Sequence, residues 1–243
     1  LTEEAKWIKN EIVTLGPAYI KMGQLVASRS DIFDEVYTNE LISLQDDVPP
    51  IDYVYIDDVL RTEFDNVHMK IFEHIDETPI ACASIGQLHL ATLHYNKNKV
   101  ALKVQKPGVE LSFEKDFKLM LSILEFFNFL YPNSRNINDL YDMIKQCSIS
   151  ILSELDYRNE KQNMDIMRNV FQDDTVYVPR VYDALTTQKV LVMEYVECQP
   201  LKALRGSNVS NVLMKSMLVN AVNNGYLHGD MHKGNFGIIV NRY

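Results

Sequence analysis

The chain has 243 residues, enough for one large domain or two small ones with their own cores. Its hydrophobic content of 47% and charged content of 23% are ordinary for a soluble globular protein. The formal net charge of -9 disfavours a nucleic-acid partner, because neutralising a nucleic-acid backbone requires clustered Lys and Arg. It does not exclude a nucleotide, whose phosphates are bound by a few local groups.

The cysteine spacing and the apolar runs exclude two further classes. Cys82, Cys147 and Cys198 are far apart and form no Cys-x-x-Cys pair, which argues against a disulfide framework or zinc site and fits a reducing compartment. The most apolar run, residues 119–130, contains Glu125 and is too short to cross a bilayer. We therefore expect the given chain to be soluble.

The first part of the chain, residues 2–64, has a helical pattern. Leu15-Gly16-Pro17 separates two expected helices, and its proline suits a first helical turn. Pro49-Pro50 ends a third helix, and Asp52 can cap a fourth that continues through Leu60.

Short strands and longer helices alternate after that. The expected strands are residues 70–72, 87–93, 100–104, 176–182, 190–195 and 236–240. The expected helices are residues 109–130, 137–171 and 210–224. No internal repeat or low-complexity linker interrupts this order.

A loop of small residues, Ala81-Cys82-Ala83-Ser84-Ile85-Gly86-Gln87, lies between two expected strands. Small side chains let a backbone approach a phosphate and form an anion-binding nest, although they also make ordinary hairpin loops. The strand Val100–Val104 follows and holds Lys103 between apolar neighbours. Such a lysine either faces water at a sheet edge or binds phosphates, as in the Val-Ala-Ile-Lys strand of kinases. The order of the two motifs favours phosphate binding.

Two further stretches fit a nucleotide site. Glu154 and Glu160 are expected on one long helix, six positions and roughly 240° apart, so we expect them to engage different groups, one of them Lys103. Acidic clusters on helices are, however, usually solvated. The apolar strand Leu191–Val196 fits the segment that joins two kinase lobes and binds an adenine edge through its backbone, although alone it indicates only a core strand.

The loop His228-Gly229-Asp230-Met231-His232-Lys233-Gly234-Asn235 resembles a phosphotransfer loop. Asp230 can orient or deprotonate an attacking hydroxyl, and the Asn235 carbonyl oxygen can ligate magnesium. Kinase-like enzymes need another acidic ligand downstream, usually in Asp-Phe-Gly, and none follows in this sequence. Because the chain starts with Leu1 rather than Met, we expect a segment of a longer protein; a truncated or degenerate relative is the alternative.

The N-terminal region contains Lys21-Met22-Gly23-Gln24 on its second expected helix. Lys21 and Gln24 share a helix face, which alone indicates a surface pair. Gly23 inside a helix costs about 1 kcal/mol relative to Ala, which indicates close packing at that position.

Together these stretches resemble the UbiB/ADCK (ABC-one) family of atypical protein-kinase-like proteins. The shared motifs, in family order, are Lys21-x-Gly23-Gln24, Gln45-Asp46-Asp47-Val48-Pro49-Pro50, Ala81–Gln87, Glu154-x-Asp156 and His228–Asn235. The resemblance covers nearly the whole chain and implies an α+β, two-lobed kinase-like fold whose C-terminal lobe is incomplete. The implied parts are an N-terminal helical extension (1–66), an N-lobe with inserted helices (67–196) and the start of the C-lobe (197–243).

The resemblance also implies a role for each motif residue. Lys103 would bind phosphates and pair with Glu160, Asp230 would be the catalytic Asp, and Asn235 and Glu154 would be metal ligands. The cofactor-binding residues would be Ala81, Ala83, Ser84, Gly86, Gln87, Lys103, Glu194 and Val196. The regulatory residues would be Lys21, Gly23, Gln24, Glu154 and Asp156, with Lys21 and Gln24 meeting the two acidic residues where a protein kinase binds its peptide.

The implied activity is that of an atypical kinase or ATPase that uses ATP (or ADP) and Mg²⁺. The implied partners are a nucleotide, prenyl lipids or quinone-biosynthesis enzymes and a membrane surface, in mitochondria, plastids or bacteria; no nucleic acid is expected. Cys82 departs from the family, since Ala is usual there. The missing Asp-Phe-Gly leaves a pseudokinase scaffold open, and the His228–Asn235 loop also occurs in small-molecule phosphotransferases, against which Lys21-x-Gly23-Gln24 and Glu154-x-Asp156 argue.

Overall fold

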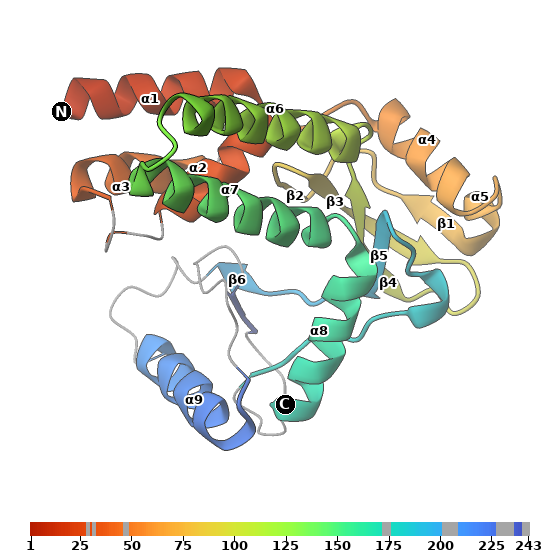
Figure 1. The fold of residues 1–243 in the computed structure, drawn as a ribbon. Coiled ribbons are helices and arrows are strands. Elements are labelled where there is room, and N and C mark those ends of the chain that lie inside the picture. Colours follow the sequence, from red (N-terminus) through yellow and green to blue (C-terminus); the bar gives the residue numbers. More distant parts are fainter. Residues whose placement is uncertain are drawn as a thin grey trace.

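The fold combines a five-stranded antiparallel sheet and a second, two-stranded sheet with several helices, seen in a computed structural model (Figure 1). The structure describes residues 1–27, 30, 33–45, 49–171, 176–200, 209–226 and 236–239. The predicted α+β class is confirmed, because helices and strands share one chain and the strands of the sheet pair antiparallel.

The N-terminal helices pack on one another before the sheet begins. They are α1 (Thr2–Leu15), α2 (Pro17–Ala27), α3 (Glu35–Leu41) and the 3₁₀ turn η1 (Ile42–Gln45). The predicted break between the first two helices is confirmed, and Gly16 supplies the positive φ of 109° on which the chain turns. A Cβ on Gly23 would lie 2.6 Å from Leu44 Cδ1 and 3.5 Å from Ile12 Cγ2, so the predicted close packing is confirmed.

Two helices precede the first strand, α4 (Tyr53–Glu63) and the single turn α5 (His68–Ile71). Helix α4 begins directly after Asp52, as predicted, although the Asp52 side chain makes no capping hydrogen bond. Its buried face, Ile56 and Leu60, belongs to the same apolar core as one face of the sheet.

The main sheet has the order β1-β3-β4-β5, with β2 paired to β3. Its strands are β1 (Phe72–Ile75), β2 (Ala81–Cys82), β3 (Gly86–Leu93), β4 (Lys99–Gln105) and β5 (Val190–Glu194). The strands predicted at 87–93, 100–104 and 190–195 are confirmed to within a residue or two. The strand predicted at 70–72 is mostly the helical turn α5, with only Phe72 in β1.

The prediction of a strand at 176–182 is wrong, apart from one bridge between Val181 and Met193. The alternating apolar pattern of this segment suggested a strand, but Pro179 lies in its centre. Because proline has no N–H to donate, it interrupts a ladder of hydrogen bonds.

The two faces of β4 serve different parts of the molecule. Val100, Leu102 and Val104 belong to the core shared with α4. Lys103 lies between Leu102 and Val104 and therefore on the other face of β4, as the alternation predicted. On that face it pairs with Leu88 of β3.

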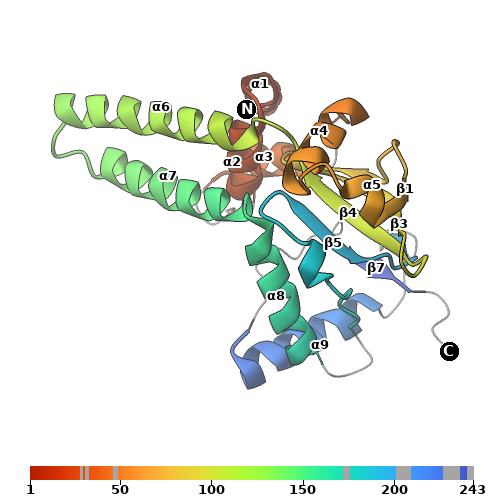
Figure 2. The same ribbon diagram turned by 90° about the vertical axis from the view of Figure 1, so that its right-hand side faces the viewer.

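The remaining helices are α6 (Val109–Leu130), α7 (Arg135–Glu154), α8 (Tyr157–Val170) and α9 (Val209–Asn224). Helices α6 and α7 run side by side as a long hairpin that extends from the sheet (Figure 2). The predicted helices 109–130 and 210–224 are confirmed, but the single helix predicted at 137–171 is broken at Leu155-Asp156.

Two short elements complete the described chain. The 3₁₀ turn η2 (Asp183–Leu185) precedes β5, and β6 (Gln199–Pro200) pairs with β7 (Gly237–Ile238). The strand predicted at 236–240 is thus present in shorter form. Among the described helices, none is both long and apolar enough to cross a bilayer.

Candidate nucleotide-binding site

An ion pair between a strand and a helix forms the centre of the candidate site. Lys103 Nζ on β4 donates to both carboxylate oxygens of Glu160 on α8, at 2.6 and 2.8 Å. The two side chains are 24% and 36% exposed, so the pair lies at the protein surface but is partly screened from water. The structure thus brings together the two residues that the sequence paired.

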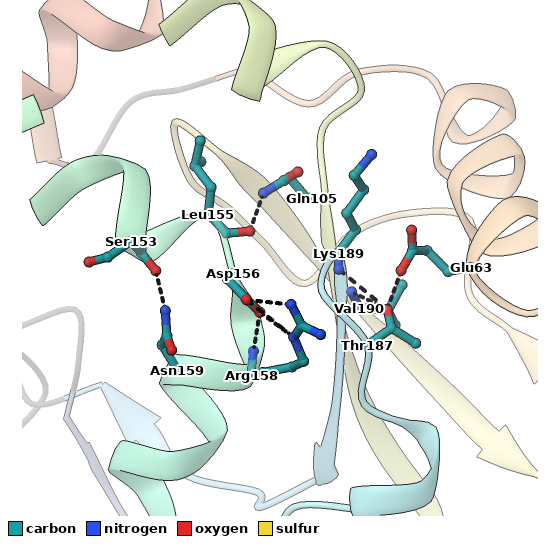
Figure 3. Close-up of polar contacts among 10 residues, drawn as sticks. All are labelled: Glu63, Gln105, Ser153, Leu155, Asp156, Arg158, Asn159, Thr187, Lys189 and Val190. Atoms are coloured by element: carbon teal, nitrogen blue, oxygen red, sulfur yellow. Dashed lines mark hydrogen bonds and ion pairs between the residues drawn. The ribbon is translucent and has the colours of Figure 1, made fainter. Parts of the chain in front are cut away.

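The first turn of α8 is fixed by contacts with β4 and with the residues just before β5. Gln105 Nε2, at the end of β4, donates to the Leu155 carbonyl at 2.8 Å (Figure 3). The Tyr157 N–H donates to the Gln188 carbonyl at 2.9 Å, just before β5. Asp156 accepts from the Arg158 N–H at 3.0 Å and so caps the helix. These bonds place Glu160 one turn along α8, within reach of Lys103.

The Ala81–Gln87 loop lies at the end of the sheet nearest to this pair. The Ala83 N–H donates to the Gly86 carbonyl at 2.8 Å and closes a tight turn, so this amide is already used within the loop. A Cβ on Gly86 would collide with the Tyr157 hydroxyl and would lie 2.8 Å from the Val104 carbonyl oxygen. The glycine is therefore required by the packing of α8 against the loop.

Tyr157 is a site residue that the sequence analysis did not single out. Its side chain is fully buried, and its ring centroid lies 4.9 Å from Lys103 Nζ. Burial, and then the nearby Glu160 carboxylate, raise the pKa of the Tyr157 hydroxyl well above its ordinary value. The available signal was its position three residues before Glu160, which puts both on one side of α8.

The predicted role of Gln87 in cofactor binding stays a prediction for its backbone, because its side chain is engaged elsewhere. Gln87 pairs with Val104 in the ladder and so points to the face opposite Lys103. It is 1% exposed, accepts from the Ile51 N–H at 2.5 Å and lies 3.4 Å from the Ile51 carbonyl oxygen. Gln87 therefore holds the segment between the N-terminal helices and α4 against the sheet.

The predicted regulatory contacts form only in part. Lys21 Nζ lies 2.6 Å from Glu154 Oε2, as predicted. Gln24 instead donates to the Leu44 carbonyl at 3.0 Å, so its predicted contact with the acidic pair is corrected. Asp156 is held by Arg158, whose guanidinium donates to it at 2.7 and 2.9 Å.

The cause of this difference is the break between α7 and α8. Glu154 is the last residue of α7 and Asp156 caps α8, so they do not belong to one continuous helix. Hydrogen bonds from the Arg158 side chain hold the pKa of Asp156 below its ordinary value. Burial opposes this shift, and the backbone N–H and the charge of Arg158 add to it more weakly.

The side chain of Glu194 also faces away from Lys103. Glu194 pairs with Val100 in the ladder, and its carboxylate accepts from the Tyr177 hydroxyl and from the Arg180 N–H at 3.3 Å. It lines a polar pocket of about 500 Å³ on that side of the strand. The predicted role of Glu194 and Val196 depends on their backbone groups, and it stays a prediction.

Several predicted residues cannot be placed. Asp230 and Asn235 lie outside the described residues, so their catalytic and magnesium roles stay predictions. Within the described part of the chain, no group of three or more His, Cys, Asp or Glu side chains could hold a metal ion. Glu154, the other predicted metal ligand, is engaged by Lys21. None of the cysteines forms a disulfide.

Register adds two apolar residues to the site. Lys103 pairs with Leu88, and its strand neighbour Ala101 lies on the same face of β4. Leu88 and Ala101 therefore lie on the same face of the sheet as Lys103. Their place on that face follows from the alternation once the strand pairing is known.

Comparisons with known proteins identify relatives of the chain. The chain is 36% identical to "Protein ACTIVITY OF BC1 COMPLEX KINASE 7, chloroplastic" of Arabidopsis thaliana, over 98% of this chain and 35% of the relative. It is 32% identical to a "Probable protein kinase UbiB" of Shewanella, over 95% of this chain and 44% of the relative. The chain thus spans less than half the length of these curated relatives.

A solved structure and a family match complete the comparison. The structure of Rv3197 from Mycobacterium tuberculosis, solved with erythromycin, has a TM-score of 0.64 and 27% identity, covering 87% of this chain and 55% of that one. Residues 43–242 match the ABC1 atypical kinase-like domain. The chain has a kinase-like fold and belongs to the ABC1 atypical kinase-like family.

Proposed function

We propose that the chain contains the nucleotide site of an atypical kinase or ATPase that uses ATP (or ADP) with Mg²⁺. The observation that carries this proposal is the Lys103–Glu160 ion pair beside a loop of small residues. In kinases the strand lysine holds the nucleotide phosphates and pairs with a helical glutamate.

The described residues fit a nucleotide in two respects. The ammonium of Lys103 can hold a phosphate, because Glu160 fixes its position without fully burying it. The apolar face of Leu88 and Ala101 suits a purine ring, whose edge would be bound by backbone groups of Glu194 and Val196. This arrangement separates a charged end of the site from an apolar end, as a nucleotide requires.

The reaction itself is assigned by resemblance. Asp230 would orient the attacking hydroxyl, and Asn235 would be a ligand of Mg²⁺, which would supply positive charge for the nucleotide phosphates. The contact between Lys21 and Glu154 supports a regulatory role for the N-terminal helices. The relative named UbiB supports a function in ubiquinone or other prenyl-lipid metabolism.

Nucleotide affinity tests the proposal. Replacing Lys103 by Met removes charge-assisted bonds to phosphate, each worth about 1.5–3 kcal/mol, so we expect roughly tenfold or greater loss of ADP affinity. Lys97→Met is a control, because Lys97, in the turn between β3 and β4, forms a 2.8 Å ion pair with Glu73 on β1 that is more exposed than the Lys103 pair. Equal affinity of Lys103→Met and the wild type, measured by calorimetry with Mg²⁺ present, would refute the proposal.

A further inference from the structure

The hydroxyl of Tyr157 is buried without an acceptor or donor. The side chain is 0% exposed, and among the described residues its oxygen has no hydrogen-bond partner. The nearest carboxylate, that of Glu160, is instead held by Lys103 through both of its oxygens. Leaving a hydroxyl unpaired in this way costs about 1–3 kcal/mol, whereas Phe would fill the same space at no such cost.

The position of this hydroxyl connects it to the candidate phosphate site. The ring lies beside the Lys103 ammonium, at 4.9 Å from its centroid, while the hydroxyl lies against Gly86 of the small-residue loop. The loop approaches so closely that no Cβ could be accommodated at residue 86. The polar end of Tyr157 is thus covered by the loop of small residues that the proposed function assigns to the phosphates.

We propose that Tyr157 is a phosphate-binding residue, whose hydroxyl donates a hydrogen bond to a nucleotide phosphate oxygen once the Ala81–Gln87 loop is displaced. The inference rests on the proposed function and adds a residue to that same site. The Lys103 ammonium attracts the phosphate to the edge of the ring, and the phosphate then replaces Gly86 as the neighbour of the hydroxyl. Because burial and Glu160 keep the hydroxyl protonated, it is a donor throughout the physiological pH range.

The substitution Tyr157→Phe separates this role from packing. It keeps the ring beside Lys103 and removes only the oxygen, so the melting temperature should be unchanged or higher. We expect the affinity for ADP to fall about tenfold, since a bond to a charged acceptor is lost, and the affinity for adenosine to stay the same. Tyr141→Phe is the matched control, because it removes another tyrosine hydroxyl that is bonded at 3.2 Å to Glu125, between α7 and α6.

The outcomes distinguish the two proposals. If wild-type protein binds ADP but Tyr157→Phe binds it equally well, only the role of Tyr157 is overturned. An equal loss of ADP and adenosine affinity would show a structural role and would also overturn it. If the wild-type protein binds neither ligand, both this inference and the proposed function fail.

Discussion

The packing of Gly23 allows a prediction about Gly23→Ala, whose effect on the free energy of unfolding should change sign when Leu44 is also replaced. In Gly23→Ala, the new Cβ would lie 2.6 Å from Leu44 Cδ1, well inside the 3.5–4.0 Å at which carbon atoms attract. Leu44 is 6% exposed and belongs to a core cluster, so its side chain has little room to rotate away. Overpacking of this kind costs about 1–3 kcal/mol, and the gain in helix propensity returns about 1 kcal/mol. The net effect should be a destabilisation of roughly 0–2 kcal/mol.

A double-mutant cycle with Leu44→Ala isolates the contact. Without the Leu44 methyl group, the substitution Gly23→Ala should stabilise the protein by about 1 kcal/mol, because only the propensity term remains. The free energy of unfolding of all four proteins, measured with urea, gives the coupling between the two positions. The reasoning is refuted if Gly23→Ala has the same effect in both backgrounds, or if it stabilises the protein that retains Leu44.

Three further predictions concern the polar contacts. Gln87→Leu leaves the Ile51 backbone without its partner and should cost about 1–3 kcal/mol of unfolding free energy in urea, whereas no change would show that the contact is dispensable. The Lys21–Glu154 pair, with side chains 19% and 41% exposed, should have a coupling energy of at most about 1 kcal/mol in a Lys21→Met/Glu154→Gln cycle. Because the folded-state pKa of Asp156 lies below its ordinary 3.8, its contribution is present above that value and is lost as pH falls through the lower folded pKa. The stability advantage over Asp156→Asn should therefore be constant near neutral pH and shrink below about pH 4; an advantage that grows there would contradict the assignment.

The residues with a strong local signal were predictable from the sequence. Period-two alternation placed Lys103 opposite Leu102, and Pro17 fixed the start of α2. These predictions hold because the signal and the structure depend on the same few neighbouring residues. The family motifs likewise identified the pair of Lys21 with Glu154 and that of Glu160 with Lys103, but not the partners of Gln24 and Asp156.

The contacts that the sequence analysis missed have two causes, which are pairing between distant segments and a weak local signal. Gln87 belongs to the Ala81–Gln87 loop motif, but its side chain accepts a hydrogen bond from the N–H of Ile51, which lies in a distant segment of the chain. The break after α7 contains no Gly or Pro, and the signal that could have revealed it was the capping ability of Asp156. Tyr157 became a candidate only when the structure placed it against Gly86 and Lys103.

The break between α7 and α8 gives the two acidic residues their separate partners. On a continuous helix Glu154 and Glu160 would be about 9 Å apart along one axis. Instead α7 presents Glu154 to Lys21, and α8 presents Glu160 to Lys103. The joint is bonded to β4, because Gln105, which lies two residues after Lys103, donates a hydrogen bond to the Leu155 carbonyl. Any rearrangement of the N-terminal helices that displaces Glu154 therefore acts on a joint that is bonded to the strand carrying Lys103.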